Sequence, residues 1–341
     1  MREVAFVLGT RAEAIKILPL VRELERRGRA YKVVSTGQHD LAEFGFARFV
    51  ELRRPRGVSG TFRSPVEGFL FSVSLVPRIR SLVKGCIVVV QGDTMSTAAG
   101  ALAGRLARGA TVCHVESGLR TFDLLEPFPE EISRVIADSL SHLHFAPTER
   151  SAGVTPRSTT HLVGNTVIDS IKARGLRVRD GGFVLFSIHR QENINSPAVM
   201  KKLVQRLEET AKRYKVKFVL SQNTRRRLEQ YGLMAAVEKR AEILPVLPYE
   251  KFLPLLASCT AVVSDSGGLA EECAFLGKPL VIFRRKTERS ESVEHGYALL
   301  GFDFDLAKFV KGFSPRRRHI YGRGDSAKKI VDVLEGVGGG R

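Results

Sequence analysis

The 341-residue sequence contains no tryptophan, and its four cysteines show neither a CxxC pair nor the spacing of a zinc site. It also lacks an apolar run of about 18 residues, the length that a membrane-spanning helix requires. The first residues, MREVAFVLGT, have none of the basic, apolar and small-residue regions of a signal peptide. We therefore expect a cytoplasmic protein with buried thiols, no bound metal and no membrane partner. Whether any cysteines pair in a disulfide is left open.

Acidic residues are in the minority: 36 Asp and Glu oppose 54 Lys and Arg, which gives a formal net charge of +18. Such a charge suits either a nucleic acid or a small anionic substrate. The basic triplets at 225–227, 284–286 and 316–318 are dispersed, and no RNP-like motif, zinc-finger spacing or heptad accompanies them. We therefore expect no nucleic-acid partner and a substrate that carries phosphate.

Short apolar strands alternate with amphipathic helices along the whole chain. The clearest strands are expected at 4–8, 32–36, 87–90, 111–115, 183–187, 216–220, 261–264 and 280–283. This alternation is typical of parallel sheets covered by helices on both faces, and the length suits two domains. The predicted fold class is α/β, with two doubly wound, Rossmann-like parallel-sheet domains that face each other across a cleft.

The domain boundaries follow from composition. Segment 175–182 is charged, bounded by glycines and without an apolar period, which is typical of a linker. We expect an N-terminal domain at 1–174 and a C-terminal domain at 182–324. A final helix, about 325–337, has no strand after it and is expected to pack back on the first domain. The Arg-, Pro- and Gly-rich segment 52–64 is expected to form a loop.

Residues 86–134 contain two apolar strands that each end in polar residues. Asp93 follows the first strand, and His114 and Glu116 lie at the end of the second. Ligands of such sheets bind outside the carboxyl ends of the strands. A proline-bounded segment then starts a helix at the same edge, with the carboxylates Glu130 and Glu131. Three segments thus offer carboxylates to one place, which makes it a candidate active site.

Two further segments are candidate phosphate sites. Ser266-Gly267-Gly268 begins a helix after a strand, so backbone amides and the helix dipole can meet an anion there. Arg11 and Lys16 follow the turn after the first strand and are expected to meet a phosphate together. Glu272 is placed to accept hydrogen bonds from ribose hydroxyls, and Arg289 to bind a phosphate as a planar fork.

Eight motifs between positions 9 and 289 together resemble the non-hydrolysing UDP-N-acetylglucosamine 2-epimerase family. In order they read GTRAEAIKILPLV, VQGDT, HVESGLRT, PFPEEISR, GNTVID, SIHRQEN, SDSGGLAEE and GKPLVIFRRKTER. The resemblance implies a two-domain fold of the glycosyltransferase-B type. It also implies an isomerase, a UDP-N-acetylglucosamine 2-epimerase.

The reaction that the resemblance implies is the reversible C2 epimerisation of UDP-N-acetylglucosamine to UDP-N-acetylmannosamine. It proceeds by elimination of UDP through 2-acetamidoglucal and re-addition of UDP. The family needs no cofactor and no metal, its product supplies surface polysaccharide or glycoprotein glycans, and it tends to form a homodimer through its first domain.

The resemblance also assigns site residues by matching motif positions. The expected catalytic residues are Asp93, Glu116, Glu130 and His189. The expected UDP-binding residues are Arg11, Lys16, Ser266, Gly267, Gly268, Glu272 and Arg289. Glu131 is expected to face away from the site. Which carboxylate acts on which face of C2 stays unassigned.

The sequence departs from the family pattern at three places. Ala12 replaces a proline, Ala270 stands where glutamine is more frequent, and Ser221-Gln222-Asn223 has no histidine. Bacterial members use a second UDP-N-acetylglucosamine as an activator near such positions, so activation here stays open. The alternatives are an epimerase of a related UDP-2,3-diacetamido sugar (uronate), a UDP-sugar glycosyltransferase of the same fold, and a hydrolysing epimerase.

Overall fold

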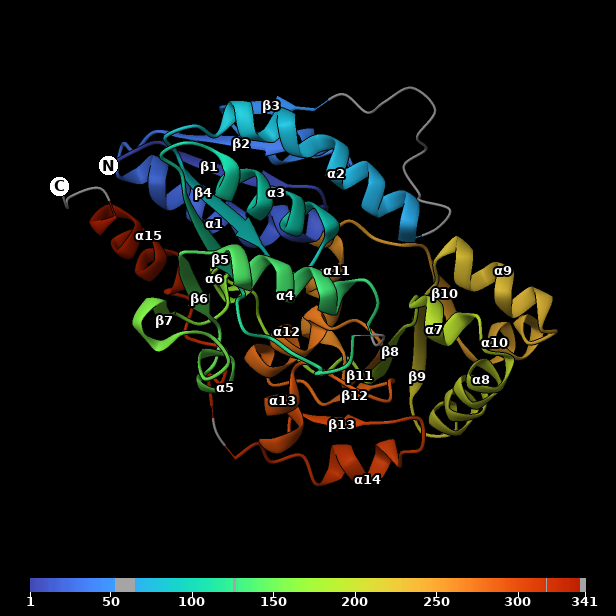
Figure 1. The fold of residues 1–341 in the computed structure, drawn as a ribbon. Coiled ribbons are helices and arrows are strands. Elements are labelled where there is room, and N and C mark those ends of the chain that lie inside the picture. Colours follow the sequence, from blue (N-terminus) through green and yellow to red (C-terminus); the bar gives the residue numbers. More distant parts are fainter. Residues whose placement is uncertain (53–64, 125–126, 317, 338–341) are drawn as a thin grey trace. The chain divides into compact units, whose positions relative to one another are not determined.

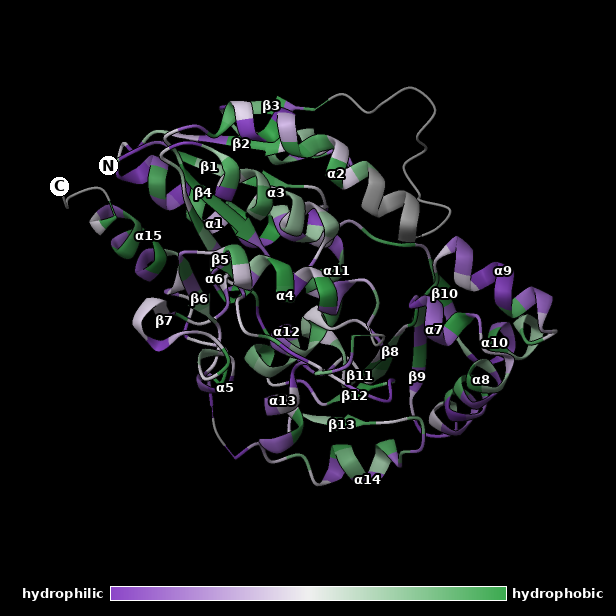
Figure 2. Cartoon of the chain, in the orientation of Figure 1, coloured by the Kyte–Doolittle hydropathy of each residue, from purple (hydrophilic) through white to green (hydrophobic). Residues whose placement is uncertain are grey.

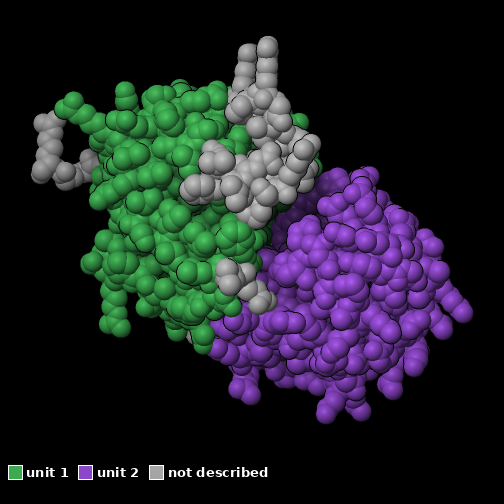
Figure 3. Space-filling model, turned by 45° about the vertical axis from the view of Figure 1, so that its right-hand side comes forward, with its two compact units in different colours: residues 1–173, 321–341 green, residues 174–320 purple. Residues whose placement is uncertain are grey.

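A computed structural model of the chain describes residues 1–52, 65–124, 127–316 and 318–337 (Figure 1). The chain forms two compact units (Figure 3). Unit 1 consists of Met1–Ala173 and Tyr321–Arg341, and unit 2 of Arg174–Ile320. Each unit contains one parallel sheet covered by helices, which confirms the predicted α/β class with two Rossmann-like sheets. The loop predicted at 52–64 lies, except for Leu52, outside the described residues.

The sheet of unit 1 has seven parallel strands in the order β3-β2-β1-β4-β5-β6-β7. The strands are β1 (Val4–Leu8), β2 (Tyr31–Ser35), β3 (Phe49–Glu51), β4 (Ile87–Gln91), β5 (Thr111–Val115), β6 (Leu143–Ala146) and β7 (Thr160–Leu162). The strand order reverses between β1 and β4, and open sheets of this kind bind ligands at such a switch point. The carboxyl ends of β1, β4 and β5 therefore frame the predicted site.

Helices cover both faces of this sheet. They are α1 (Arg11–Arg26), α2 (Pro65–Leu82), α3 (Met95–Leu106), α4 (Glu130–Leu140), α5 (Glu149–Ala152), α6 (Thr166–Lys172) and α15 (Ser326–Gly336), with 3-10 turns η1 (Ala42–Phe44) and η2 (Arg157–Thr159). Side chains of β1 alternate between the two faces. Val4, Phe6 and Leu8 pack in a cluster with α1 and α15, whereas Ala5 and Val7 pack with α2 and α3.

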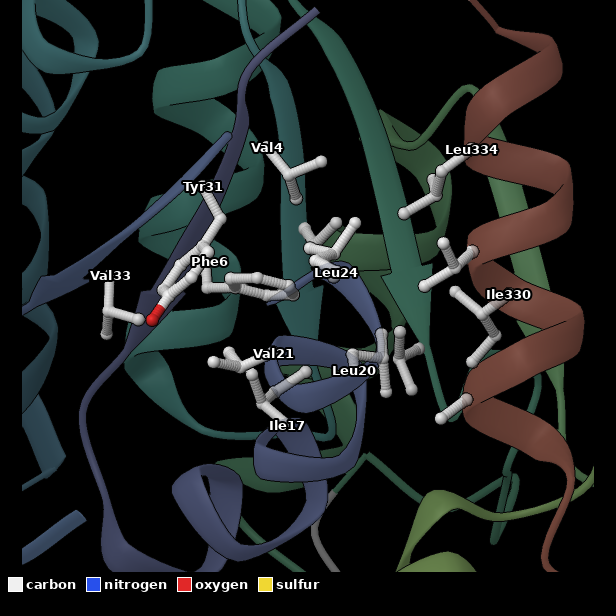
Figure 4. Packing of buried hydrophobic residues seen from close by; sticks show 14 of the residues in the cluster. Val4, Phe6, Ile17, Leu20, Val21, Leu24, Tyr31, Val33, Ile330 and Leu334 are labelled. Atoms are coloured by element: carbon white, nitrogen blue, oxygen red, sulfur yellow. The ribbon is translucent and has the colours of Figure 1, made fainter. Parts of the chain in front are cut away.

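The C-terminal helix α15 completes the core of unit 1. Ile330 and Leu334 are fully buried and face Leu20 and Leu24 of α1 (Figure 4). The carboxylate of Asp169 in α6 accepts hydrogen bonds from the first amides of α15, Ser326 N at 3.2 Å and Ala327 N at 3.0 Å. Helix α15 is therefore an integral part of the first unit.

The sheet of unit 2 has six parallel strands in the order β10-β9-β8-β11-β12-β13. The strands are β8 (Phe183–Ser187), β9 (Lys215–Val219), β10 (Glu242–Leu244), β11 (Ala261–Ser264), β12 (Leu280–Ile282) and β13 (Ala298–Leu300). The order reverses between β8 and β11, which is the same arrangement as in unit 1. The ends of β8 and β11 are therefore the ligand position that this topology predicts.

Eight helices of unit 2 surround that sheet. They are α7 (Gln191–Ile194), α8 (Pro197–Ala211), α9 (Gln222–Gln230), α10 (Met234–Arg240), α11 (Tyr249–Ser258), α12 (Gly268–Leu276), α13 (Ser290–Glu294) and α14 (Leu306–Lys311). The central strands β11 and β12 are apolar and buried, whereas β9 carries two lysines and α9 is mostly hydrophilic (Figure 2). This contrast follows from burial of both faces of a parallel sheet.

The segment that was expected to be a linker is bonded to unit 2. Arg179 N donates to Ala257 O at 3.1 Å, and Gly181 N donates to Ser258 O at 2.7 Å. The buried Lys278 ammonium reaches the carbonyls of Arg179 and Cys259 at 2.7 and 2.6 Å. The chain therefore crosses between the units at residues 173–174 and again at 320–321.

All four cysteines are buried and free, as expected for buried thiols: Cys86, Cys113, Cys259 and Cys273. Burial raises the pKa of the Cys113 thiol to about 12, so this thiol is neutral at physiological pH. Across the described ranges, no helix is both long and apolar enough to span a bilayer.

Candidate active site

Glu116 occupies the centre of the site in unit 1. It follows β5 in a left-handed conformation, with φ of 66°, which a residue with a side chain adopts only when its surroundings enforce it. The carboxylate is buried, and Lys16 Nζ lies 2.6 Å from its Oε1. Asn165 Nδ2 donates to the same oxygen at 2.7 Å, and the Gln91 amide donates to Oε2. Side chains from three other segments of unit 1, Lys16, Gln91 and Asn165, thus hold the Glu116 carboxylate.

Asp93 lies beyond the end of β4, directly after Gly92, which lies beside Glu116. An added Cβ at the preceding residue, Gly92, would be 3.6 Å from Oε2 of Glu116. The Asp93 carboxylate is 30% exposed and forms an ion pair with the buried guanidinium of Arg134. Each of the two carboxylates therefore has its own cation, and Asp93 remains accessible to a ligand.

The expectation that Glu131 faces away from the site is wrong. Its side chain is buried, and its Oε2 lies 3.0 Å from Arg134 Nη1. Backbone amides of Thr121 and Phe122 donate to the same carboxylate at 3.1 and 3.3 Å. Glu131 therefore orients Arg134, and through Arg134 it orients Asp93. Adjacent helical residues such as Glu130 and Glu131 point in different directions, but the direction of Glu131 leads to other residues of unit 1 and not to solvent.

Glu130, the first residue of α4, is partly exposed. It lies four residues before Arg134 and eight before Asp138, so all three side chains share one face of the helix. The positive end of the helix dipole stabilises a carboxylate at this position. The structure thus places Glu130 on the same face of α4 as the cation that binds Asp93.

Glu13 was not identified from the sequence as a site residue. It is buried, and it accepts hydrogen bonds from the amides of Gly9 and Thr10 at 3.0 and 2.7 Å and from the hydroxyls of Thr94 and Thr97 at 2.7 and 3.1 Å. Burial raises the pKa of Glu13, and these donors partly oppose the rise. The residue joins the turn after β1 to the turn after β4. A capping Glu three residues after Thr10 was the available sequence signal.

Arg11 and Lys16, which were predicted to meet a phosphate, have different protein partners. Arg11 is exposed and forms an ion pair with Glu43 at 2.9 Å, whereas Lys16 is directed to Glu116. Only Lys16 therefore belongs to the carboxylate cluster of unit 1 in this conformation.

The site in unit 2 is built around Asp265, which sequence reasoning missed. Asp265 follows β11 and is fully buried. Its carboxylate accepts hydrogen bonds from the backbone amides of His189 and Arg190, at 3.1 and 2.9 Å, and from Asn193 Nδ2 at 3.0 Å. The His189 ring is half exposed, with its Nδ1 3.4 Å from the same carboxylate. Asp265 therefore fixes the turn after β8 and leaves the His189 ring accessible.

The glycine segment after Asp265 opens helix α12. Gly267 is the N-cap, and an added Cβ there would lie 2.6 Å from Oε1 of Glu288 and 2.8 Å from Nη1 of Arg289. An added Cβ at Gly268 would meet nothing within 4 Å. The segment therefore has protein behind it at Gly267 and open space beside Gly268, where an anion has room at the helix N-terminus.

Arg289 is buried and bonded to protein. Its Nε lies 3.0 Å from Oε1 of Glu271, and its Nη1 forms an ion pair with Glu288. Glu288 also pairs with the buried Arg284 at 3.0 Å. Arg289 thus supports the glycine segment from behind. Glu272 accepts a hydrogen bond from the Tyr249 hydroxyl at 2.9 Å and is 7% exposed.

The predicted residues therefore form two sets. Unit 1 contains Arg11, Lys16, Asp93, Glu116 and Glu130, and unit 2 contains His189, Ser266, Gly267, Gly268, Glu272 and Arg289. Arg11 and Asp93 follow β1 and β4 at the switch point of unit 1, and His189 and Ser266 follow β8 and β11 at the switch point of unit 2. Within the described residues, no group of three His, Cys, Asp or Glu side chains is arranged to hold a metal ion.

The family model of UDP-N-acetylglucosamine 2-epimerase matches residues 22–335. The chain belongs to the UDP-N-acetylglucosamine 2-epimerase family. It is 31% identical over 366 aligned positions to the UDP-N-acetylglucosamine 2-epimerase of Methanocaldococcus jannaschii, with 97% of this chain and 98% of the relative covered. The predicted membership, and with it the enzyme class of an isomerase, is confirmed.

Solved structures agree with this membership. The M. jannaschii UDP-GlcNAc 2-epimerase in complex with UDP-GlcNAc and UDP superposes with a TM-score of 0.81, at 28% identity and over 98% of this chain and 99% of that one. A spinosyn rhamnosyltransferase, 15% identical with a TM-score of 0.53, shares the fold over 98% of this chain and 96% of its own. This chain therefore has the predicted α/β fold of the glycosyltransferase-B type.

Proposed function

We propose that the protein interconverts UDP-N-acetylglucosamine and UDP-N-acetylmannosamine by inversion at C2. The observation that carries the proposal is the carboxylate pair Glu116 and Asp93 at the switch point of unit 1. Each carboxylate is held by its own cation, Lys16 or Arg134. One oriented carboxylate can take the C2 proton, and a second acid/base group, in its protonated form, can donate a proton from the other face.

The proposed reaction begins with loss of the C2 proton to a carboxylate. The electron pair of the C–H bond forms a C1–C2 double bond, and the C1–O bond breaks with its electrons going to UDP. The resulting 2-acetamidoglucal then receives UDP again at C1 and a proton at C2 from the opposite face. Asp93, Glu116 and Glu130 are the proposed acid/base groups, and their individual faces remain unassigned.

The proposed nucleotide position is the glycine segment of unit 2. Ser266, Gly267 and Gly268 offer amides and a helix N-terminus to the pyrophosphate, which stabilises the charge of departing UDP. His189, half exposed above Asp265, is the proposed partner of the leaving group or of a proton step. Glu272 is proposed to accept a hydrogen bond from the ribose, and Arg11 and Lys16 are proposed to bind the nucleotide.

The support that Arg289 gives is proposed to be indirect. Its guanidinium contacts the carboxylates of Glu271 and Glu288 in unit 2 and lies directly behind Gly267. Arg289 therefore contributes to nucleotide binding by holding the amides of the glycine segment in place, in addition to the positive charge that it provides.

The test is proton NMR of the pure protein with UDP-N-acetylglucosamine in heavy water, without added metal or nicotinamide. UDP-N-acetylmannosamine with deuterium at C2 of both sugars is the expected result. Free N-acetylmannosamine plus UDP would indicate a hydrolysing enzyme instead. An unchanged sugar nucleotide would contradict the proposal and direct the assay to a UDP-2,3-diacetamido sugar, and then to transfer onto an acceptor.

The His189→Ala variant sharpens this assay. Near-complete loss of epimerisation with UDP binding at least partly retained is expected, since Asp265 still orders the turn through Arg190 and Asn193. His295→Ala, at the end of α13 in the same unit, is the matched control. Full activity of His189→Ala would remove His189 from the mechanism.

The proposed assembly is a cytoplasmic homodimer, formed through the first unit and needing no cofactor. Unit 1 has an apolar groove of about 460 Å³ between α2, α3 and α4, lined among others by Val73, Val76, Leu102 and Ile136. Val73 is 43% exposed at this groove, and a second copy of the chain bound there would remove it from water. Sedimentation of the wild type and of Val73→Asp tests this, with a dimer and a monomer expected. A monomeric wild type would overturn it.

A further inference from the structure

His114 is fully buried at the penultimate position of β5, next to Val90 of β4 and His144 of β6 in the sheet. Its two ring nitrogens have different partners. Nε2 lies 2.8 Å from the carbonyl oxygen of Gly92, and Nδ1 is hydrogen-bonded to Oδ1 of Asp138 on α4. The ring thus connects helix α4 to the backbone immediately before Asp93.

The hydrogen-bond partner of His114 Nε2 shows that this nitrogen is protonated. A backbone carbonyl is only an acceptor, so the contact with Gly92 O requires an N–H at Nε2. In a neutral imidazole, Nδ1 would then be unprotonated and would need a donor. A donor at that position would have to be a protonated Asp138.

The surroundings of Asp138 keep it ionised. Gly118 N donates to its Oδ2 at 3.1 Å, Arg120 forms an ion pair with the same oxygen, and the Ser117 hydroxyl donates to Oδ1. Both nitrogens of His114 therefore face acceptors.

We propose that His114 is a buried imidazolium that acts as a positioning residue for Asp93. It donates from Nδ1 to the Asp138 carboxylate and from Nε2 to the Gly92 carbonyl. The charged and titratable groups beside it are Asp138 on α4, His144 on the neighbouring strand β6, and Arg120, which pairs with the same Asp138 carboxylate. Its part in catalysis rests on the proposed function, whereas its charge state does not.

Gly92, the residue before Asp93, is held at both of its peptide groups. Gly92 has φ of 76°, and its N–H donates to Val115 O at 3.0 Å. The His114 ring holds the other end of the same residue. Arg134, one turn before Asp138, holds the Asp93 carboxylate itself. Helix α4 therefore sets both the backbone before Asp93 and the Asp93 side chain.

Nitrogen NMR of the folded full-length protein with labelled histidine tests the charge state at neutral pH. Two protonated ring nitrogens are expected for His114. His142 is an internal reference, because its Nδ1 accepts a hydrogen bond from Val112 N at 2.9 Å and so has no proton. Burial also lowers the pKa of His142. An unprotonated nitrogen in the His114 ring would overturn the proposal.

Assignment of the His114 signals uses the His114→Gln variant. The sequence has eight histidines. If the His114→Gln variant does not fold, single His→Gln variants at the other seven identify the signals of those histidines, and the remaining signals belong to His114. The charge state is thus measurable whether or not the protein tolerates a change at His114.

The Asp138→Asn variant tests the positioning role. It is expected to convert His114 to a neutral ring in the NMR spectrum and to lower kcat about tenfold to hundredfold, as for outer partners of reactive groups. KM is expected to change little, because Asp138 touches no nucleotide-binding group. His142→Gln is the control with unchanged kcat. Wild-type kcat in Asp138→Asn with a neutral His114 would overturn the positioning role.

Failure of the proposed epimerase activity gives a different pattern. In that case the wild type would show the two protonated nitrogens of His114 and no C2 exchange in the sugar assay. The charge state of His114 would then stand and the proposed function would fall.

Discussion

Lys16 on α1 and Glu116 after β5 are 100 residues apart in sequence, yet Lys16 Nζ lies 2.6 Å from Glu116 Oε1. Both side chains are largely buried, with exposed fractions of 12% and 3%. A buried carboxylate is costly unless a cation and hydrogen-bond donors surround it. The pair therefore holds Glu116 ionised at the point where the proposed reaction needs a base.

Glu116→Gln keeps the size of the side chain and removes its charge. We expect epimerisation to fall by about two to four orders of magnitude, the usual contribution of a general base. UDP binding is expected to persist, because the glycine segment belongs to the other unit. Coupled turnover assays and calorimetric UDP binding measure the two effects. Wild-type turnover in this variant would contradict the proposed site.

Lys16→Gln leaves the Glu116 carboxylate with two neutral donors. Loss of a hydrogen bond to a charged group costs roughly 1.5–3 kcal/mol in unfolding free energy. Arg11→Gln on the same helix is a matched control, because its ion pair with Glu43 is exposed and worth about 0–1 kcal/mol. Urea unfolding of both variants tests the difference. Equal losses of unfolding free energy in the two variants would show that burial of the Lys16–Glu116 pair does not increase its contribution to stability.

The two glycines at the start of α12 are expected to respond differently to alanine. Gly267→Ala places a methyl group 2.6 Å from Glu288 Oε1, so both thermal stability and UDP affinity are expected to fall. Gly268→Ala meets no protein atom within 4 Å, so stability is expected to hold while UDP affinity falls. Unchanged UDP binding in Gly268→Ala would place the pyrophosphate elsewhere.

Glu23 provides a pH-dependent contribution to the stability of unit 1. Its hydrogen bond to Arg26, then that to Arg27, lowers the pKa of Glu23 to about 2 from 4.5. Because the folded pKa is depressed, the stabilisation is present above the unfolded value of 4.5 and is lost as the pH falls towards 2. Glu23→Gln should therefore be less stable than the wild type at neutral pH, with the difference vanishing near pH 2. A difference that does not depend on pH would exclude this ion pair as its cause.

Leu334→Ala tests the packing of α15 on unit 1. Leu334 is fully buried, and truncation of a buried leucine costs about 2–5 kcal/mol in unfolding free energy. Lys329→Ala, on the exposed face of the same helix, is the control and should change little. A small effect of Leu334→Ala would mean that the helix is not part of the cooperative core.

The fold was predictable because its main signals are local. Five-residue apolar runs such as β1 and β4 and the helical period of α1 are legible in the sequence. The edge strands β3, β10 and β13 were not predicted, since each has only three residues and carries no distinct period. These strands are defined by pairing with their neighbours, which no local pattern records.

The site was predictable only in part, for a related reason. Asp93, Glu116 and His189 stand at strand ends, where position alone indicates a ligand. Asn165, which binds Glu116, and Asp265, which orders the His189 turn, act on residues 49 and 76 positions away. Glu131 was misjudged because the helical register gives the direction of its side chain but not the residues of other segments that the side chain meets.

The return of the chain to unit 1 has a consequence for biosynthesis. Residues 1–173 leave the ribosome first, but Ile330 and Leu334, which close their core against Leu20 and Leu24, are made last. In the nascent chain, the apolar face of the first unit that α15 covers therefore stays uncovered while the whole second unit is translated. Premature termination before α15 would release a chain that looks nearly complete in length but has an open core, and such a chain is a substrate for chaperones and proteases.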